Sequence, residues 1–354
     1  MKVFWIAGEP SGDLQASALV AALQKDVPEI EHAGWGGERM ADAGMKQIYD
    51  LPGQPIMGFV EVALKATTII KQVSKVKNDI ASFGADLVVL VDYAGFNLRV
   101  AQWAKSQGIK VVYFIPPKIW AWKESRLKSL KSYSDLILSI LPFEEQWYKE
   151  NDAEAHYVGN PLMEQYKVLN HYRSESKKVV LLPGSRIQEV TRLMPQFTLL
   201  AKALPEYTFH VVRASSMKQS WPIEIVPENM IVEDKLLSEV TDGAEFALTC
   251  SGTASLEIAL LGIPQAVVYR ANPISLAIAK QLVKVKYFSL PNLIMDAPVV
   301  PEFLQIEVNV TNMKALILQS NEVQLESLSQ LHATMGSRNL AQDAVPRILA
   351  LLNA

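Results

Sequence analysis

The chain has 354 residues, 49% hydrophobic and 20% charged, which favours two domains with full cores over one. Its net charge of −3 argues against binding nucleic acid through bulk electrostatics, so we expect no nucleic-acid partner. The single cysteine, Cys250, excludes a disulfide framework and a cysteine metal cluster, and it fits a reducing cytoplasm.

No segment predicts export or a membrane anchor. The first apolar stretch, Val3 to Ala7, is too short for a signal peptide, and no apolar run approaches the length that spans a bilayer. We therefore expect a soluble or peripheral protein.

Short apolar runs alternate with helical patterns along almost the whole chain. Most runs are continuously apolar, which is typical of strands covered on both faces. Strands that alternate with helices predict parallel sheets with right-handed crossovers. In chain order the expected strands are Lys2–Ala7, Ala85–Val91, Lys110–Ile115, Leu136–Leu141, His156–Val158, Lys177–Leu182, Tyr207–Val212, Met230–Val232, Phe246–Thr249 and Gln265–Tyr269.

The strand pattern restarts near Lys177, after the polar stretch at 170–178, which we interpret as a linker. We therefore predict an α/β protein of two Rossmann-like, doubly wound domains, at 1–169 and 170–336, that face each other across a cleft. In such sheets ligands bind outside the carboxyl ends of the strands. The loops expected there are 8–13, 92–99, 116–123, 182–186 and 251–257.

The loop "LPGSR" (182–186) follows one of these strands. Backbone N–H groups at a helix start, the Ser185 hydroxyl and the Arg186 guanidinium suit a phosphate oxygen, and Gly184 turns the chain. A plain turn with a helix cap and a solvated arginine explains the same residues equally well.

The loop "SGTASLE" (251–257) also leads from a strand into a helix. Ser251, Gly252 and Thr253 are suited to hold a pyrophosphate on free N–H groups, and Glu257 to accept hydrogen bonds from ribose hydroxyls. Capping and compensation of the helix dipole are the ordinary alternatives. Two such loops in one half favour a nucleotide, and a nucleotide-sugar fits the absence of dinucleotide and Walker motifs.

In the first half, Asp92 directly follows the apolar run "DLVVLV". A partly desolvated carboxylate at the carboxyl end of a strand is a candidate general base, and an acid that binds loop N–H groups is the alternative. Trp120 and Trp122 follow the next strand and suit sugar rings or acyl chains, although buried structural tryptophans are more common. No histidines are spaced as metal ligands, so no metal site is expected.

Nine stretches together resemble the lipid-A-disaccharide synthase family of inverting glycosyltransferases. In order they are "AGEPSGD" (7–13), "MGFVEV" (57–62), "DYAGFNLR" (92–99), "IWAWK" (119–123), "LPFE" (141–144), "LLPGSR" (181–186), "SGTASLEIAL" (251–260), "YR" (269–270) and "SLPNLI" (289–294). The resemblance implies a GT-B fold, with the donor nucleotide mainly in the second domain. It also implies a final helix, at about 337–352, that packs back on the first domain.

The implied reaction joins UDP-2,3-diacylglucosamine to 2,3-diacylglucosamine 1-phosphate (lipid X). It releases UDP and forms the β-1,6-linked disaccharide 1-phosphate of lipid A biosynthesis, and it implies no cofactor and no metal. By motif, Asp92 is then the candidate base and Arg186 the candidate for stabilising phosphate charge. The expected UDP contacts are Gly184, Ser185, Ser251, Gly252, Thr253, Glu257, Arg270 and Asn292, and the acceptor-side loop contains Glu9, Ser11, Gly12 and Asp13.

One position departs from the family pattern. In "VGNPL" (158–162) the resemblance leads us to expect Gly-His-Pro, but Asn160 stands in place of the histidine. An amide does not titrate near neutral pH. Asn160 therefore either only forms hydrogen bonds or marks a change in the acceptor site, and we do not include it among the catalytic residues.

Because both implied substrates carry acyl chains, we expect peripheral binding to the inner face of the inner membrane of a Gram-negative bacterium. An amphipathic helix within 57–80 is the expected contact. Its core stripe consists of Val62, Ala66, Ile69, Val73, Val76 and Ile80, and its membrane patch of Val60, Leu64, Lys71 and Lys75. An ordinary surface helix is the alternative.

Other functions share these features. A related GT-B enzyme with another substrate, such as an N-acetylglucosaminyltransferase or a UDP-sugar epimerase, has a similar layout, and so has a two-lobed binding protein. Acyl-chain selectivity stays open, and so does the oligomeric state, for which a homodimer is one possibility.

Overall fold

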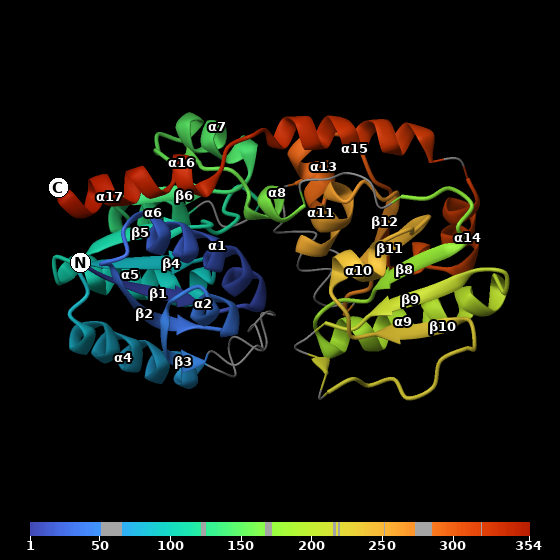
Figure 1. Ribbon diagram of the computed structural model, residues 1–354, viewed down its shortest axis with the longest axis horizontal. Helices are drawn as coiled ribbons and strands as arrows, with labels where there is room; N and C mark the ends of the chain where they lie inside the picture. Colours follow the sequence, from blue (N-terminus) through green and yellow to red (C-terminus); the bar gives the residue numbers. More distant parts are fainter. Residues whose placement is uncertain are drawn as a thin grey trace. The chain divides into compact units, whose positions relative to one another are not determined.

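The computed structural model describes residues 1–50, 66–121, 125–166, 172–214, 217–218, 220–250, 252–272, 285–319 and 321–354, without the side chains of 66–68. It divides into two compact units (Figure 1), and we describe each by itself. Unit 1 contains Met1–Glu164 and Ser337–Ala354, and unit 2 contains Gln165–Lys280 and Val285–Gly336. No helix in the described part of the chain is long and apolar enough to cross a membrane.

Unit 1 is built on a seven-stranded parallel sheet in the order β3-β2-β1-β4-β5-β6-β7. Its strands are β1 (Lys2–Ala7), β2 (Glu31–Gly36), β3 (Lys46–Asp50), β4 (Leu87–Val91), β5 (Lys110–Phe114), β6 (Leu136–Ser139) and β7 (His156–Tyr157). Its helices are α1 (Pro10–Asp26), α2 (Glu38–Asp42), α4 (Ala66–Phe83), α5 (Ala94–Ser106), α6 (Arg126–Tyr133), α7 (Pro142–Glu150), α16 (Leu340–Asp343) and α17 (Val345–Asn353), and α8 (Pro161–Gln165) ends at the boundary with unit 2.

Unit 2 is built on a six-stranded parallel sheet in the order β10-β9-β8-β11-β12-β13. Its strands are β8 (Lys178–Leu182), β9 (Thr208–Val212), β10 (Met230–Glu233), β11 (Phe246–Cys250), β12 (Gln265–Tyr269) and β13 (Glu302–Leu304). Its helices are α9 (Ile187–Ala203), α10 (Leu237–Thr241), α11 (Thr253–Leu260), α13 (Leu290–Met295), the short 3₁₀ helix η2 (Gln305–Glu307), α14 (Val310–Leu318) and α15 (Glu322–Met335).

The prediction of two doubly wound parallel sheets is confirmed. Every expected strand is present, and the ends differ from the expectation by no more than two residues. The central strand β4 is buried along its whole length. Helices cover both faces of the sheet, which is why such strands consist of unbroken apolar runs.

Three strands were missed: β2, β3 and β13. The sequence of β2, "EHAGWG", contains no apolar run, yet Trp35 is fully buried in the core of unit 1. Gly34 permits this pairing, because a Cβ there would lie 2.2 Å from the carbonyl oxygen of Trp5 on β1. Both β3 and β13 lie at sheet edges. Because β3 is mostly exposed and β13 has only 3 residues, they carry little apolar signal.

The C-terminal segment packs within unit 1. The Lys110 Nζ donates to the carbonyl oxygen of Leu351 over 2.7 Å, and the Leu340 N–H donates to Glu164 over 3.1 Å. A Cβ at Gly159 would lie 2.2 Å from the carbonyl oxygen of Arg338. The end of the chain is therefore held by close backbone contacts.

Helix α4 buries one stripe. Ile69, Val73, Val76 and Ile80 belong to the core of unit 1, as the helical spacing predicts. The other two residues of the expected stripe, Val62 and the side chain of Ala66, lie outside the described residues.

Replacing Gly34 by alanine tests the close approach of β1 and β2. We expect Gly34→Ala to lower the unfolding free energy by roughly 2 kcal/mol or more, because backbone must move to admit the methyl group. Gly95→Ala on α5 is the control, since a Cβ there meets nothing within 4 Å. Urea unfolding of both variants checks this, and equal stabilities would contradict it.

Candidate active site

In each unit the strand order reverses between two central strands, β1 and β4 in unit 1 and β8 and β11 in unit 2. Ligands of doubly wound folds bind at such switch points. The loops after these four strands are 8–13, 92–99, 182–186 and 251–257, which are four of the five loops singled out from the sequence. The fold therefore brings them together in pairs, one pair in each unit.

Asp92 lies directly after β4 in a strained backbone conformation. Its φ is 45° and that of Tyr93 is 46°, so two consecutive non-glycine residues are left-handed. The Asp92 carbonyl oxygen accepts hydrogen bonds from Asn97 Nδ2 (2.9 Å) and from the Tyr113 hydroxyl (2.7 Å). These hydrogen bonds stabilise a main-chain conformation that is otherwise unfavourable for non-glycine residues.

The electrostatic surroundings of Asp92 make its carboxyl a better proton acceptor than an ordinary aspartate. Burial raises its pKa, while the Lys118 ammonium and the Tyr93 N–H oppose the rise. A pKa above the ordinary range is what a base that works near neutral pH requires. The neighbouring phenol of Tyr113 stays a proton donor, because burial raises its pKa well above 10.

The acceptor-side loop contacts the Asp92 loop at one point. A Cβ on Gly8 would lie 2.4 Å from Tyr93 Cδ1, so the ring of Tyr93 packs against the glycine. The charge of Glu9 reaches the same ring, since it adds to the effect of burial in raising the pKa of Tyr93. Glu9 and Ser11 are half-buried, and Gly12 is buried within α1.

Asp13 has a structural role in this conformation. Its buried carboxylate accepts hydrogen bonds from the N–H groups of Gly37 (2.8 Å), Arg39 (3.2 Å) and Met40 (3.2 Å). It therefore holds the start of α2, and capping of this kind is what aspartate commonly does at helix starts.

The loops after β5 and β6 add a buried pair that was not predicted. Glu144 is 2% exposed and accepts a hydrogen bond from Trp120 Nε1 over 2.9 Å. Trp120 is itself buried and packs edge-on against Phe143, which favours the structural interpretation of this tryptophan. Trp122 lies outside the described residues. The motif "LPFE" points to Glu144, but nothing in the sequence shows that it is buried.

In unit 2 the loop after β8 is fixed by Glu189, a residue that sequence reasoning missed. Its carboxylate accepts hydrogen bonds from Arg186 Nη1 (2.7 Å) and from the Ser185 N–H (3.1 Å). Gly184 has a φ of 109°, and a Cβ on it would lie 2.3 Å from Glu189 Oε2. The backbone N–H of Ser185 is thus used by the protein itself, and the helix α9 begins one residue after Arg186.

The loop after β11 is open where the nucleotide was expected. Gly252 has a φ of 140° and no atom within 4 Å of an added Cβ, and α11 begins at Thr253. The side chain of Ser255 closes the first turn on the Gly252 carbonyl over 2.8 Å. Glu257 is half-buried on this helix, and Ser251 lies outside the described residues.

Arg270 and Asn292 use their side chains inside unit 2. Arg270 donates to the carbonyl oxygens of Gln305 (3.2 Å) and Val308 (2.9 Å). Asn292 is 1% exposed and is bonded at both ends, to Val300 and to Glu302. In this conformation both side chains hold loops in place.

Asn160 is also structural. Its side chain donates to the carbonyl oxygen of Ile140 (3.1 Å) and accepts from the N–H of Leu162 (3.0 Å), and it is 2% exposed. Of the two explanations for the missing histidine, these bonds favour the one in which the position only forms hydrogen bonds.

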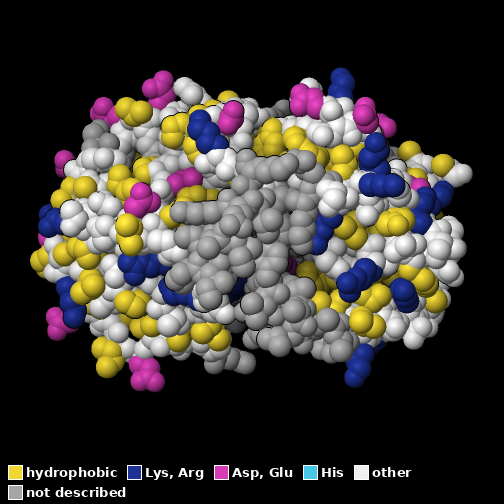
Figure 2. Space-filling view, turned by 180° about the vertical axis from the view of Figure 1, so that it is seen from behind, with side chains coloured by type: hydrophobic (Ala, Val, Ile, Leu, Met, Phe, Trp, Pro, Cys, Tyr) yellow, Lys and Arg dark blue, Asp and Glu magenta, His cyan; other side chains and the backbone are white. Residues whose placement is uncertain are grey.

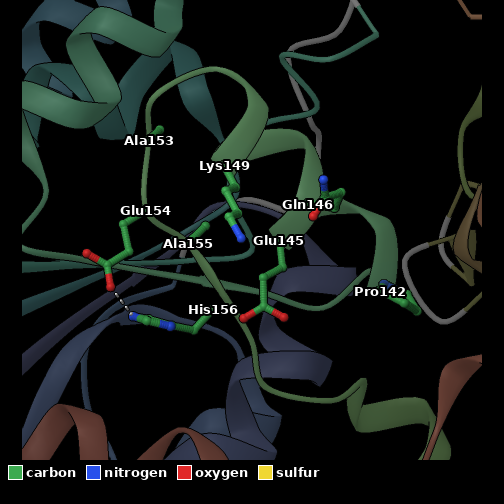
Figure 3. A pocket seen from close by; sticks show the side chains of 8 residues that line it. All are labelled: Pro142, Glu145, Gln146, Lys149, Ala153, Glu154, Ala155 and His156. Carbon is green, nitrogen blue, oxygen red and sulfur yellow. Dashed lines mark ion pairs between the residues drawn. The ribbon is translucent and has the colours of Figure 1, made fainter.

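A separate pocket lies on unit 1 beside the edge strand β7 (Figure 3). Its walls carry Glu145, Lys149 and the ion pair of Glu154 with His156, whose atoms are 3.4 Å apart. None of its residues was predicted to be functional. Among the described residues there is no group of three or more acidic, histidine or cysteine side chains that could hold a metal ion.

The architecture is that of GT-B proteins, the class of two-domain sugar-nucleotide enzymes. The glycotransferase of kitacinnamycin superimposes with a TM-score of 0.68 at 12% identity, over 99% of both chains. The calicheamicin glycosyltransferase CalG4 gives 0.64 at 13%, over 99% of this chain and 98% of that one. A UDP co-structure of MnaA from S. aureus gives 0.65 at 16%, over 99% and 97%.

Sequence comparison narrows the class. Residues 3–345 match the family described as Lipid-A-disaccharide synthetase, so the chain belongs to this family. The lipid-A-disaccharide synthase of Granulibacter bethesdensis is 31% identical, over 99% of this chain and 93% of its own. That of Syntrophus aciditrophicus is 32% identical, over 99% and 97%.

Replacing Gly184 by alanine tests the prediction from the sequence that the loop after β8 (182–186) binds phosphate. We expect Gly184→Ala to weaken binding of UDP at least about tenfold, because the methyl group displaces Glu189 and the residue resists a φ of 109°. Gly243→Ala is the control, since Gly243 also has a positive φ but leaves room for a methyl group. Calorimetric titration with UDP measures both, and equal affinities would contradict the expectation.

Proposed function

We propose that the protein transfers 2,3-diacylglucosamine from its UDP derivative to the 6-hydroxyl of 2,3-diacylglucosamine 1-phosphate. The products are UDP and the β-1,6-linked disaccharide 1-phosphate. The observation that carries this proposal is the family match over residues 3–345, together with a strained, proton-attracting aspartate at the switch point of unit 1.

The change from an α-linked donor to a β-linked product requires a single in-line displacement. The acceptor oxygen attacks the anomeric carbon, the bond to the diphosphate breaks, and UDP leaves with the electron pair. No covalent intermediate is needed, so the protein must position the hydroxyl, take its proton and stabilise the departing charge.

Asp92 is the residue that we assign to the proton. Its pKa is raised by burial, and its main chain is fixed by Asn97 and Tyr113, so the carboxylate is basic and held in place. Glu9 and Ser11 are the remaining half-buried residues of the loop after β1, and we assign this loop to the acceptor sugar.

The diphosphate is assigned to unit 2. Arg186 supplies a positive charge that Glu189 orients, and Gly184, Ser185, Gly252 and Thr253 line the neighbouring strand ends. The start of α11 offers N–H groups to an anion, and Glu257 suits the ribose. Ser251 is a further proposed contact of UDP, and Arg270 and Asn292 are proposed to support the site by holding neighbouring loops. A cofactor is not required by this chemistry.

Substrates with acyl chains require access to a lipid surface, and we propose that the protein binds the inner face of the inner membrane peripherally. Lys71 and Lys75 are exposed on α4, with Ile70 61% exposed between them and the core stripe. The Lys75 ammonium lies 3.7 Å from the centre of the Tyr49 ring, a cation–π contact that fixes its position on unit 1. Figure 2 shows basic, acidic and apolar side chains intermixed on the described part of one surface, so the proposed lipid binding depends on the residues of α4 themselves. Val60 and Leu64, the other proposed patch residues, lie outside the described residues.

Mass spectrometry of the products tests the activity itself. With both acylated glucosamine substrates we expect the tetra-acyl disaccharide 1-phosphate and UDP in equal amounts. A donor without acyl chains should react far more slowly. Transfer from the non-acylated donor at an equal rate, or epimerisation of it, would favour a related GT-B enzyme instead.

Substitutions test the assigned roles. We expect Asp92→Asn and Arg186→Ala each to lower turnover by about a hundredfold or more in folded protein, since each removes a group that acts in the transition state. The control is Asp86→Asn, at the opposite end of β4, where the carboxylate binds the Lys2 N–H over 2.7 Å. Activity of Asp92→Asn close to that of Asp86→Asn would remove Asp92 as the base.

Vesicle pelleting tests the membrane patch. At low salt, Lys71→Glu is expected to reduce binding to vesicles that contain anionic lipid by about fivefold, because one favourable contact becomes repulsive. Lys25→Glu, with the same charge change at the exposed end of α1, is the control. Equal binding of the two variants would argue against α4 as the contact.

A further inference from the structure

Three neighbouring strands of unit 1 end beside one another, and each is followed within a few residues by a charged side chain. Asp92 follows β4, Lys118 follows β5 and Glu144 follows β6, and these strands pair in that order. Adjacent strands of a sheet lie about 4.8 Å apart, so the three residues follow the same end of three consecutive strands. The proposed function uses only the first of them.

Glu144 is an unusual member of this group because it is almost completely buried at the start of α7. Its oxygen Oε1 accepts a hydrogen bond from Trp120 Nε1. Burying a carboxylate is costly, and burial raises the pKa of Glu144 to about 7. Trp120, Lys118 and the backbone of Leu141 oppose the rise, and the charge of Asp92 adds to it.

Building on the proposed role of Asp92, we propose that Glu144 is a positioning residue for the proton transfer. Fixed by Trp120, its carboxyl shares the positive charge of Lys118 with Asp92 and so governs how strongly Asp92 attracts the proton of the acceptor hydroxyl.

The sign of the effect follows from the order in which the two carboxyls ionise. Below pH 7 Glu144 is protonated and neutral, and Lys118 acts on Asp92 alone, which weakens its attraction for a proton. Above about pH 7 Glu144 is ionised, and its negative charge opposes the effect of Lys118 on Asp92. Asp92 is then the stronger base, so transfer speeds up as the pH rises through 7.

Among the described residues, the tyrosine phenols near Asp92 do not change charge in this range. Burial raises the pKa of Tyr93, Tyr113 and Tyr148, which keeps these phenols neutral. Glu9 acts on Tyr93, and Arg126, beside Tyr113, stays positively charged. Among the described neighbours of Asp92, Glu144 is therefore the one whose charge changes near pH 7.

The test compares the pH dependence of kcat/KM in Glu144→Gln and in wild type, measured as UDP release. Glutamine keeps the acceptor for Trp120 and imitates the protonated carboxyl. At pH 6 we expect the variant to stay within about twofold of wild type, and at pH 8.5 to be about three- to tenfold slower, with the inflection near pH 7 gone. A merely structural role would slow the enzyme equally at both pH values.

Glu145→Gln is the matched control. This carboxylate is the next residue on α7 but is only half-buried, at the pocket beside β7 (Figure 3), where it lies 3.7 Å from Arg338 Nη1. We expect it to keep the wild-type profile. A profile of Glu144→Gln that matches that of Glu145→Gln, or that is lowered uniformly, would overturn the proposal.

Lys118→Gln keeps the proposal testable if Glu144→Gln does not fold, because Lys118 is exposed. Since Lys118 lowers the pKa of both carboxyls, its removal should move the acid limb and the inflection to higher pH together. Movement of neither, or of only one, would contradict a shared charge. If wild type makes no disaccharide at all, the proposed function fails; if it does and these profiles are unchanged, only the role of Glu144 fails.

Discussion

The backbone of Asp92 at the end of β4 is the constraint on which the rest of unit 1 depends. Two successive left-handed residues, Asp92 and Tyr93, cost roughly 1–3 kcal/mol each, and folding must offset this cost. The hydrogen bonds from Asn97 and Tyr113 to the Asp92 carbonyl do so, as do those from the Asp92 N–H to the carbonyls at the end of β5. Backbone strain of this kind is typical of functional sites, where the position of a side chain is maintained at a cost to the stability of the protein.

Unit 2 uses a similar device at its own switch point. There the carboxylate of Glu189 holds both the Ser185 N–H and the Arg186 side chain, and Gly184 leaves the room that this carboxylate needs. In both units a side chain from the helix that follows the loop fixes that loop: Asn97 comes from α5 and Glu189 from α9. The loops at the carboxyl ends of the central strands are thereby held rigid. Transfer chemistry requires such pre-organisation, because the reacting groups must be held in position.

The features that could be predicted from the sequence are those that a local residue pattern determines. Leu87–Val91 is recognisable because a strand covered on both faces must be apolar, and Asp92 stands out because an acid ends that run. The strand β2 was missed because its sequence contains no apolar run. One of its positions, Gly34, must be glycine because the backbone of β1 lies too close for a side chain. Asp13 and Asn292 were expected to lie in the loops that contact the substrates, but both form hydrogen bonds within their own units. The side-chain types that bind ligands are also those that cap helices and close loops. Glu144 acquires its role from burial against Trp120, a residue distant in the chain, which no local pattern reveals. Glu189 bonds residues just before it in the chain, but nothing in the sequence distinguishes it from an ordinary acid in the first turn of a helix.

The clamp on Asp92 is tested most directly by removing one hydroxyl. Tyr113→Phe deletes the donor to the Asp92 carbonyl and leaves the ring in place. Tyr148→Phe is the matched change, because among the described residues the buried Tyr148 hydroxyl has no hydrogen-bond partner. With a hydrogen bond worth about 1 kcal/mol, our account predicts that kcat of Tyr113→Phe falls about fivefold at unchanged KM, while Tyr148→Phe keeps the wild-type rate. Equal kcat values for the two variants would contradict it.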